Sequence, residues 1–164
     1  FSGEIGHFPL LNNNCICHCG KMGCLETGAS GSAVHRIFLE KLKEGRTSTL
    51  SEKYLRGEII HIDEIIDAVN EEDVLAIEVI EEIGTTLGRA IAGLINLFNP
   101  ELIIIGGKIS ETKDYLLLPI KSAVQKHSPN IINSDTSIKF SKLGKKAGVI
   151  GSCMLSRSRL LGLF

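Results

Sequence analysis

Four of the five cysteines in this 164-residue chain fall between residues 15 and 24. Thiolate sulfur and imidazole nitrogen are the ligands that tetrahedral zinc prefers, and a histidine also precedes this cluster. One Cys₃His tetrahedron can be closed by four of the residues, namely His7, Cys17, Cys19 and Cys24. Four protein ligands leave no coordination position for water, as in structural zinc sites. The spacing therefore predicts a structural zinc ion that fixes the conformation of a loop.

Two further residues of the cluster are surplus to this ligand set. Cys15 could replace one ligand, but thiols at the alternate positions 15, 17 and 19 do not easily reach one metal together. His18 is expected to face solvent. The alternative to a metal site is a group of buried, reduced thiols in a glycine-rich loop. An odd number of cysteines does not favour a disulfide framework, and Cys153 is predicted to be a small core residue.

Composition limits the classes of function. With 43% hydrophobic residues, the chain can bury one core. Its formal net charge of -1 provides no basic excess for a nucleic-acid surface. We expect a cytoplasmic protein, because the sequence has neither a long apolar run nor a secretory leader at its start.

The first half of the chain has a helical pattern. Apolar residues recur at helical spacing over residues 29–44, and Gly45 supplies a stop. Residues 46–57 are polar and are predicted to be a surface connection. A short helix is predicted over residues 62–69.

The longest predicted helix covers residues 73–98. Asp73 can cap its start, and Asn99 and Pro100 end it. Its glycines lower the helix propensity but allow another backbone to approach closely. They are Gly84, Gly88 and Gly93.

The second half of the sequence predicts an α/β fold. An all-apolar run at residues 102–105 is typical of a fully buried parallel strand. We expect a helix over residues 115–126, a strand over residues 138–140 and a helix over residues 147–161. Gly106 and Gly107 follow the first strand, where ligands of open α/β sheets gather. They would lie beside a nucleotide or sugar cleft, although a purely structural glycine turn is the alternative.

Several motifs together resemble the ROK family, which comprises sugar-responsive transcriptional repressors and sugar kinases. The first group of motifs is Gly3-Glu4-Ile5-Gly6-His7, then Cys17-His18-Cys19-Gly20 to Gly23-Cys24-Leu25-Glu26, then Ala29-Ser30. The second group is Leu97-Phe98-Asn99-Pro100-Glu101, Ile104-Ile105-Gly106-Gly107 and Gly148-Val149-Ile150-Gly151-Ser152. The resemblance spans nearly the whole chain.

The resemblance implies a two-lobed, actin-like or hexokinase-like ATPase fold of the ribonuclease H-like type. Residues 1–164 would be its C-terminal lobe, with a sugar-facing zinc loop over residues 1–28 and an α/β body over residues 29–164. Glu4, His7 and Glu26 would bind the sugar, with His7 also ligating zinc. Gly106 and Gly107 would contact ATP in a kinase.

The catalytic and DNA-binding segments of the family lie outside the part that this chain resembles, which limits its expected activity. Kinases of the family have a catalytic aspartate and a phosphate loop in the first lobe, and repressors have a preceding helix-turn-helix. Neither has a counterpart here, and the opening at Phe1 indicates a fragment, which by itself should neither phosphorylate sugar nor bind DNA.

Three functions remain open for the parent protein. The favoured one is a repressor, because residues 26–30 and 46–54 are more similar to that branch. It would sense a sugar or sugar phosphate, bind DNA through the absent domain and form a homodimer or higher homo-oligomer. The second is a sugar kinase that uses ATP and Mg²⁺. The third is a zinc-stapled association module without a sugar ligand.

Overall fold

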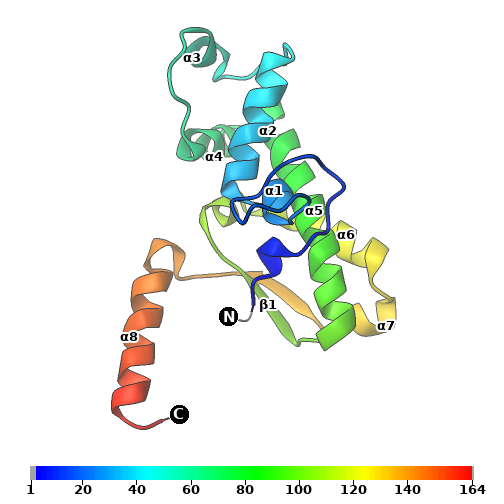
Figure 1. Ribbon diagram of the computed structural model, residues 1–164, viewed down its shortest axis with the longest axis vertical. Coiled ribbons are helices and arrows are strands. Elements are labelled where there is room, and N and C mark those ends of the chain that lie inside the picture. The colour runs from blue at the N-terminus through cyan, green and yellow to red at the C-terminus, as the bar shows by residue number, and fades with distance from the viewer. Residues whose placement is uncertain (1–2, 164) are drawn as a thin grey trace.

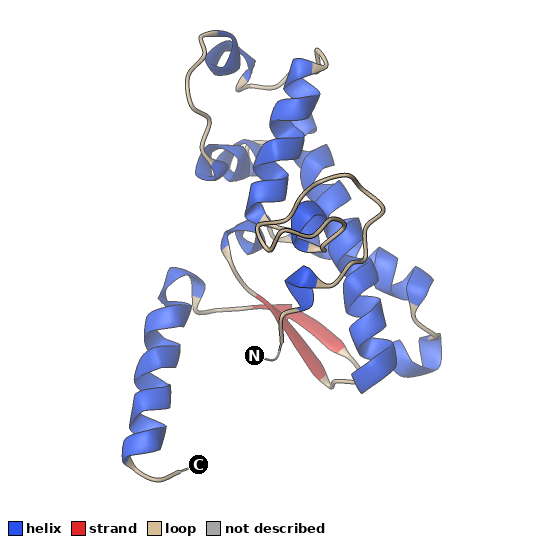
Figure 2. Cartoon of the chain, viewed as in Figure 1, coloured by secondary structure: helices blue, strands red, loops and turns tan. Residues whose placement is uncertain are grey.

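The computed structural model describes residues 3–163, apart from the side chains of residues 132, 133 and 145. Helices dominate this part of the chain, and two strands lie near its middle (Figures 1 and 2). The helices are α1 (Glu26–Ala29), α2 (Gly31–Lys43), α3 (Ser51–Leu55), α4 (Ile62–Asn70), α5 (Val74–Phe98), α6 (Asp114–His127), α7 (Asn130–Asn133) and α8 (Ala147–Leu160). The strands are β1 (Leu102–Ile105) and β2 (Ser137–Phe140), and three 3-10 turns are η1 (Ile5–His7), η2 (Lys108–Thr112) and η3 (Gly144–Lys146).

The two strands pair in parallel, with Leu102 opposite Ser137 and Ile105 opposite Phe140. The connection between them contains α6, because parallel strands need a long crossover. The predicted α/β order is therefore confirmed.

Helix α5 is the central helix of the core, and its buried side chains occur along most of its length. The Asp73 carboxylate caps its start by accepting from the backbone N–H of Ala76 at 2.9 Å. Asn99 ends it in the left-handed conformation, with φ 43°. Both predicted ends are confirmed. Neither α5 nor another helix within residues 3–163 combines the length and the apolar character needed to cross a membrane.

Close packing of α5 on α6 depends on two glycines. A Cβ atom at Gly84 would lie 2.7 Å from Cγ of Pro119, and one at Gly88 would lie 2.6 Å from the carbonyl oxygen of Ile120. The predicted close approach is confirmed at these two positions. It is wrong for Gly93, where a Cβ would meet nothing within 4 Å.

Two local predictions in the first half need correction. The helix expected over residues 29–44 is α2, which begins only at Gly31 because Ser30 adopts an extended conformation and caps it through its hydroxyl, and the short helix α1 before it was not predicted. Residues 46–57 are not only a connection, since they contain α3.

The prediction of a strand buried on both faces is also wrong. Ile105 is 7% exposed, whereas Leu102 is 47% exposed and Ile104 is 62% exposed. Helices cover only one face of this strand pair within the described chain (Figure 2). Helix α8 stands apart from the rest of the fold in the same view, and none of its residues is buried. Cys153 on α8 is therefore exposed and not a core residue.

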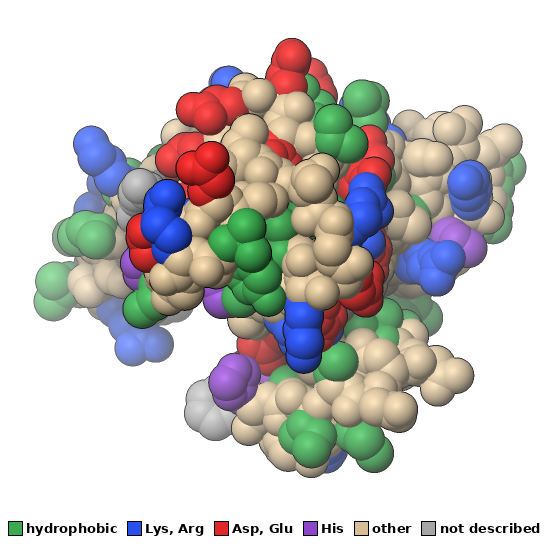
Figure 3. All heavy atoms as spheres, turned by 90° about the horizontal axis from the view of Figure 1, so that it is seen from above, with side chains coloured by type: hydrophobic (Ala, Val, Ile, Leu, Met, Phe, Trp, Pro, Cys, Tyr) green, Lys and Arg blue, Asp and Glu red, His purple; other side chains and the backbone are tan. Residues whose placement is uncertain are grey.

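The distribution of charged side chains on the surface agrees with the small net charge. In the view of Figure 3, acidic and basic side chains lie near one another, and no broad area of that face is basic alone. Ion pairs such as Arg46–Glu78 and Lys41–Glu82 join several of these charges.

Candidate metal centre

A small folded loop brings the predicted metal ligands together. Two isolated antiparallel bridges, Pro9 with Cys24 and Ile16 with Met22, fold residues 9–24 back on themselves. The backbone N–H of Cys17 donates to the carbonyl of Lys21 at 2.8 Å and closes the tip. Gly23 has φ +76°, and a Cβ there would lie 2.4 Å from the carbonyl oxygen of Leu11. Glycine is therefore required at this position of the loop.

The ligand atoms of four residues converge on one point. They belong to His7, Cys17, Cys19 and Cys24 and all lie within 4.8 Å of one another. The Cys19 and Cys24 sulfurs are 3.6 Å apart, and the Cys17 sulfur is 3.4 Å from Nδ1 of His7. With zinc–sulfur bonds of about 2.3 Å, the edge of a tetrahedron is about 3.8 Å. The residue set and its spacing can hold a metal ion, and zinc is the ion that we predict.

The protonation states of the thiols affect how a metal enters. The backbone N–H of Lys21 favours the thiolate of Cys19 and lowers its pKa. A backbone hydrogen bond also favours the thiolate of Cys17, but burial and a hydrogen bond to Glu26 outweigh it and raise the Cys17 pKa to about 12. Burial raises the pKa of Cys24. Metal binding must therefore displace protons from at least two thiols.

The two surplus residues lie outside the group of four ligands. Cys15 is half-buried, and His18 is exposed to solvent, as expected. All five cysteines are free thiols.

Two glutamates flank the imidazole of His7 on opposite sides. Oε2 of Glu26 lies 3.5 Å from Nδ1 of His7, and it accepts a hydrogen bond from the Cys17 thiol at 3.2 Å. Oε2 of Glu4 lies 3.9 Å from Nε2. His7 can therefore direct Nδ1 to a metal while Nε2 faces outward beside Glu4, an arrangement in which an outer carboxylate orients a ligand histidine.

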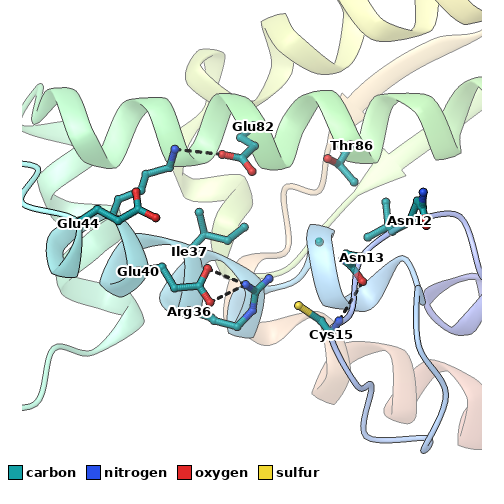
Figure 4. Close-up of a pocket in the computed structure, with 12 residues that line it drawn as sticks. Asn12, Asn13, Cys15, Arg36, Ile37, Glu40, Glu44, Glu82 and Thr86 are labelled. Carbon is teal, nitrogen blue, oxygen red and sulfur yellow. Dashed lines mark hydrogen bonds and ion pairs between the residues drawn. The ribbon is translucent and has the colours of Figure 1, made fainter.

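Two cavities adjoin the loop. One, of about 270 Å³, is lined by residues that include Cys17, Glu26 and Arg36. The other, of about 430 Å³, lies between the loop, α2 and α5 and is shown in Figure 4. Arg36 and Cys15 line both cavities.

Gly106 and Gly107 lie at the carboxyl end of β1, where the chain turns into η2. Gly107 has φ +88°, a conformation that suits glycine. The backbone N–H of Ser141 donates to the carbonyl of Ile105 at 2.8 Å, so the ends of both strands meet here. A nucleotide-binding role for the glycine pair stays a prediction.

Sequence reasoning missed a set of residues that supports Glu26. The hydroxyl of Thr27 donates to the carbonyl of Cys24 at 2.7 Å, and Asn13 donates to that hydroxyl at 3.2 Å. Arg36 donates to the Thr27 carbonyl at 2.8 Å. The spacing of Arg36 and Glu40 predicts an ion pair along a helix, but no pattern predicts the contact with Thr27.

Solved structures that match this fold include ROK kinases and a ROK regulator, which have an actin-like, hexokinase-like fold. A ROK family transcriptional regulator, described as a homologue of the E. coli MLC protein, matches with a TM-score of 0.76 and 37% identity, over 85% of this chain and 34% of that chain. A ROK family glucokinase from Streptomyces griseus, solved with glucose and AMPPNP, matches with a TM-score of 0.78 and 26% identity, over 96% of this chain and 52% of that chain.

The ROK family model matches residues 1–159, and the chain belongs to the ROK family. Glucokinase of Halalkalibacterium halodurans is 36% identical over 159 residues, which are 96% of this chain and 48% of that protein. The DNA-binding transcriptional dual regulator NagC of Escherichia coli K12 is 35% identical over 161 residues, which are 98% of this chain and 38% of that protein. The N-acetylglucosamine repressor of Escherichia coli O157:H7 matches with the same values. The chain thus spans less than half the length of these relatives, and the resemblance inferred from the motifs is confirmed.

Proposed function

We propose that this chain is the C-terminal, sugar-sensing lobe of a ROK-family transcriptional repressor. A structural zinc ion on His7, Cys17, Cys19 and Cys24 would hold the loop, and a sugar would bind against Glu4, His7 and Glu26. The observation that carries the proposal is the imidazole of His7, which lies between the candidate metal ligand Cys17 at Nδ1 and Glu4 at Nε2.

The chemistry of these groups suits a sugar. Ionised carboxylates only accept hydrogen bonds, and sugar hydroxyls supply donors in pairs. The Glu4 side chain is 65% exposed and that of Glu26 is 34% exposed, so both carboxylates have room for a ligand. A metal on Nδ1 of His7 fixes the proton on Nε2, which can then donate to a sugar oxygen.

In the proposed repressor, the sugar or sugar phosphate binds in a cleft between two lobes and changes the angle between them. That change alters the spacing of DNA-binding domains in a homodimer or higher homo-oligomer in the cytoplasm. The similarity to a ROK regulator at 37% identity and to NagC at 35% supports this function.

A ROK sugar kinase is the second candidate. The similarity to a glucokinase at 36% identity favours it, as does the position of Gly106 and Gly107 at the carboxyl end of β1. This protein would transfer a phosphoryl group from ATP and Mg²⁺ to a sugar hydroxyl, and the catalytic base would lie outside this chain.

Calorimetric titration of the intact, zinc-loaded protein tests the sugar site. The probes are D-glucose and N-acetyl-D-glucosamine, because relatives are named for these two sugars. We expect Glu26→Ala to abolish binding, because the variant lacks the carboxylate acceptor. Glu52→Ala should retain it, because that glutamate is 89% exposed on α3. Unchanged affinity in Glu26→Ala would remove this residue from the site.

A second pair of assays separates the two candidates. The repressor requires that the sugar changes the affinity of the intact protein for operator DNA, without phosphorylation of the sugar when ATP and Mg²⁺ are added. Turnover of the sugar to a phosphorylated product would identify a kinase instead.

A further inference from the structure

We propose that Arg36 is a positioning residue for the sugar site, which holds the backbone of Thr27 and thereby fixes the direction of the Glu26 carboxylate. The inference rests on the proposed function, because it gives Arg36 a role only if Glu26 binds a sugar.

The guanidinium of Arg36 joins two partners at once. Its Nη2 donates to the carbonyl of Thr27 at 2.8 Å. Its Nη1 donates to both carboxylate oxygens of Glu40, at 2.9 and 2.8 Å. Figure 4 shows the Arg36 and Glu40 side chains facing each other beside the larger cavity. A planar guanidinium offers donors in a fixed fork, so the pairing with Glu40 holds the other donor toward Thr27.

The short helix that carries Glu26 depends on such external contacts. Helix α1 has four residues and ends at Ala29, because the backbone of the next residue, Ser30, is extended. A helix this short cannot satisfy its last carbonyl groups internally, and it has little stability of its own. Arg36 supplies a partner for one of these carbonyls from the neighbouring helix α2.

Thr27 is held from two directions. Its hydroxyl donates to the carbonyl of Cys24, a ligand of the candidate metal centre. Its carbonyl accepts from Arg36. Residue 27 therefore links the metal loop to α2, and the adjacent Glu26 takes its direction from this link.

The hydrogen bond from Arg36 to Thr27 can affect ligand binding because of where Glu26 lies. Glu26 and Arg36 both line the cavity of about 270 Å³. The polar contacts of the Glu26 carboxylate are with Cys17 and His7, which are candidate metal ligands. If Arg36 is removed, the Thr27 carbonyl loses its hydrogen bond from α2, and the Glu26 carboxylate is no longer held in one direction. The four candidate metal ligands all precede residue 25 and keep their own contacts.

A purely structural role for Arg36 predicts something different. An exposed ion pair four residues apart on a helix adds little to stability. As a simple surface pair, Arg36–Glu40 would leave sugar affinity unchanged on removal. Sugar affinity measured at constant zinc content therefore distinguishes the two roles.

The test compares variants of the intact, zinc-loaded protein by calorimetry with D-glucose and N-acetyl-D-glucosamine. We expect Arg36→Met to weaken binding about tenfold, the effect of losing one charge-assisted hydrogen bond, with unchanged zinc stoichiometry. Arg36→Lys should recover part of the affinity, because an ammonium can reach one of the two partners. Arg46→Met is the matched control, since Arg46 pairs at 2.7 Å with Glu78 of α5 and not with a residue of α1.

A double-mutant cycle with Glu26→Gln tests whether Arg36 acts through Glu26. In that background, Arg36→Met should cause no further loss of affinity, because the group that it positions is already altered. Fully additive losses overturn the inference, as does unchanged affinity in Arg36→Met or an equal loss in Arg46→Met. Loss of zinc from Arg36→Met also overturns it, because Arg36 would then support the metal loop itself.

Glu40→Gln keeps the test decisive if Arg36→Met folds poorly. This variant leaves the Thr27 contact possible but weakens the pairing that orients the guanidinium, so we expect a smaller loss, of about threefold. Unchanged affinity in this variant contradicts the inference. Absence of sugar binding in the wild-type protein overturns the proposed function itself. Full binding by Glu26→Ala removes Glu26 from the site and the positioning role with it, whereas loss in Glu26→Ala without loss in the Arg36 variants overturns only the positioning role.

Discussion

Loss of the proposed zinc ion should open the loop locally and leave the helical body folded. The perturbation is Cys19→Ser, which removes the exposed ligand of the cluster, or a chelator added to the wild-type protein. Zinc binding is linked to the folding of the segment that holds the ligands, so we expect the loop to lose its ordered conformation when zinc is removed.

The loss of stability in the loop can be estimated from the small number of its side chains that are buried. Among residues 3–25, the buried hydrophobic side chains are Cys17, Cys24 and Leu25. The main core cluster runs from Ala33 to Val124 and contains none of them. Zinc contributes about 10–16 kcal/mol to the folding of small zinc-binding peptides, so opening of the loop should become easier by about that amount.

The helical body should lose much less of its free energy of unfolding than the loop. Its loss is limited to contacts such as those of Leu25, which correspond to about 2–3 kcal/mol of buried apolar surface. For a chain of this length, that loss lowers Tm by roughly 4–12 °C.

Hydrogen exchange measured by mass spectrometry separates the two regions. Peptides from residues 3–25 should lose protection in Cys19→Ser and in the chelated wild type, while peptides from α5 keep it. Cys15→Ser is the matched control, because Cys15 lies outside the ligand group and its replacement should leave about one zinc per chain. If α5 loses protection together with the loop, the metal stabilises the whole fold, and if the loop stays protected without metal, the structural zinc site is wrong.

Two further predictions concern the body. Gly88→Ala should lower the free energy of unfolding in urea by about 1–3 kcal/mol, because its Cβ would lie 2.7 Å from that of Ala123. Gly93→Ala should raise it by up to about 1 kcal/mol, because a Cβ there meets no neighbour. Equal effects of the two substitutions would contradict the close packing of α5 on α6. Asp73 is buried, and although burial disfavours its charge, hydrogen bonds from Thr49, Ala76 and Ser48 outweigh this and lower its pKa. Its contribution is therefore present above an unfolded-state pKa of about 3.9 and is lost as pH falls through the lower folded-state value. Asp73→Asn should cost about 2 kcal/mol at pH 7 and progressively less below pH 4, and a difference independent of pH would contradict this explanation.

Local patterns in the sequence were sufficient for much of the fold. Asp73 and Asn99 mark the ends of α5 by capping chemistry that depends on neighbouring residues alone. The parallel strand pair follows from the apolar run at residues 102–105 and the strand predicted over residues 138–140, which are separated by a helix. The break at Ser30 was missed because helical spacing continues across it, and α3 was missed because five polar-rich residues carry too weak a pattern.

Burial in the second half was harder to predict, because it depends on what covers each face. The run Leu102–Ile105 is apolar throughout, yet only the face toward the helices is covered within residues 3–163. Cys153 has the size and polarity of a core residue but lies on α8, which has no buried residue. The sequence records hydrophobicity at each position and not the presence of a neighbour.

The types and spacing of residues by themselves determined the candidate ligand set, because thiolate and imidazole within a short segment have few other uses, and the motifs determined the ROK family. Only the tertiary structure decided that Nδ1 of His7 faces the sulfurs while Nε2 faces Glu4, and that Arg36 reaches Thr27. These relations depend on how α1, α2 and the loop pack in space, and packing between segments leaves no periodic pattern in the chain.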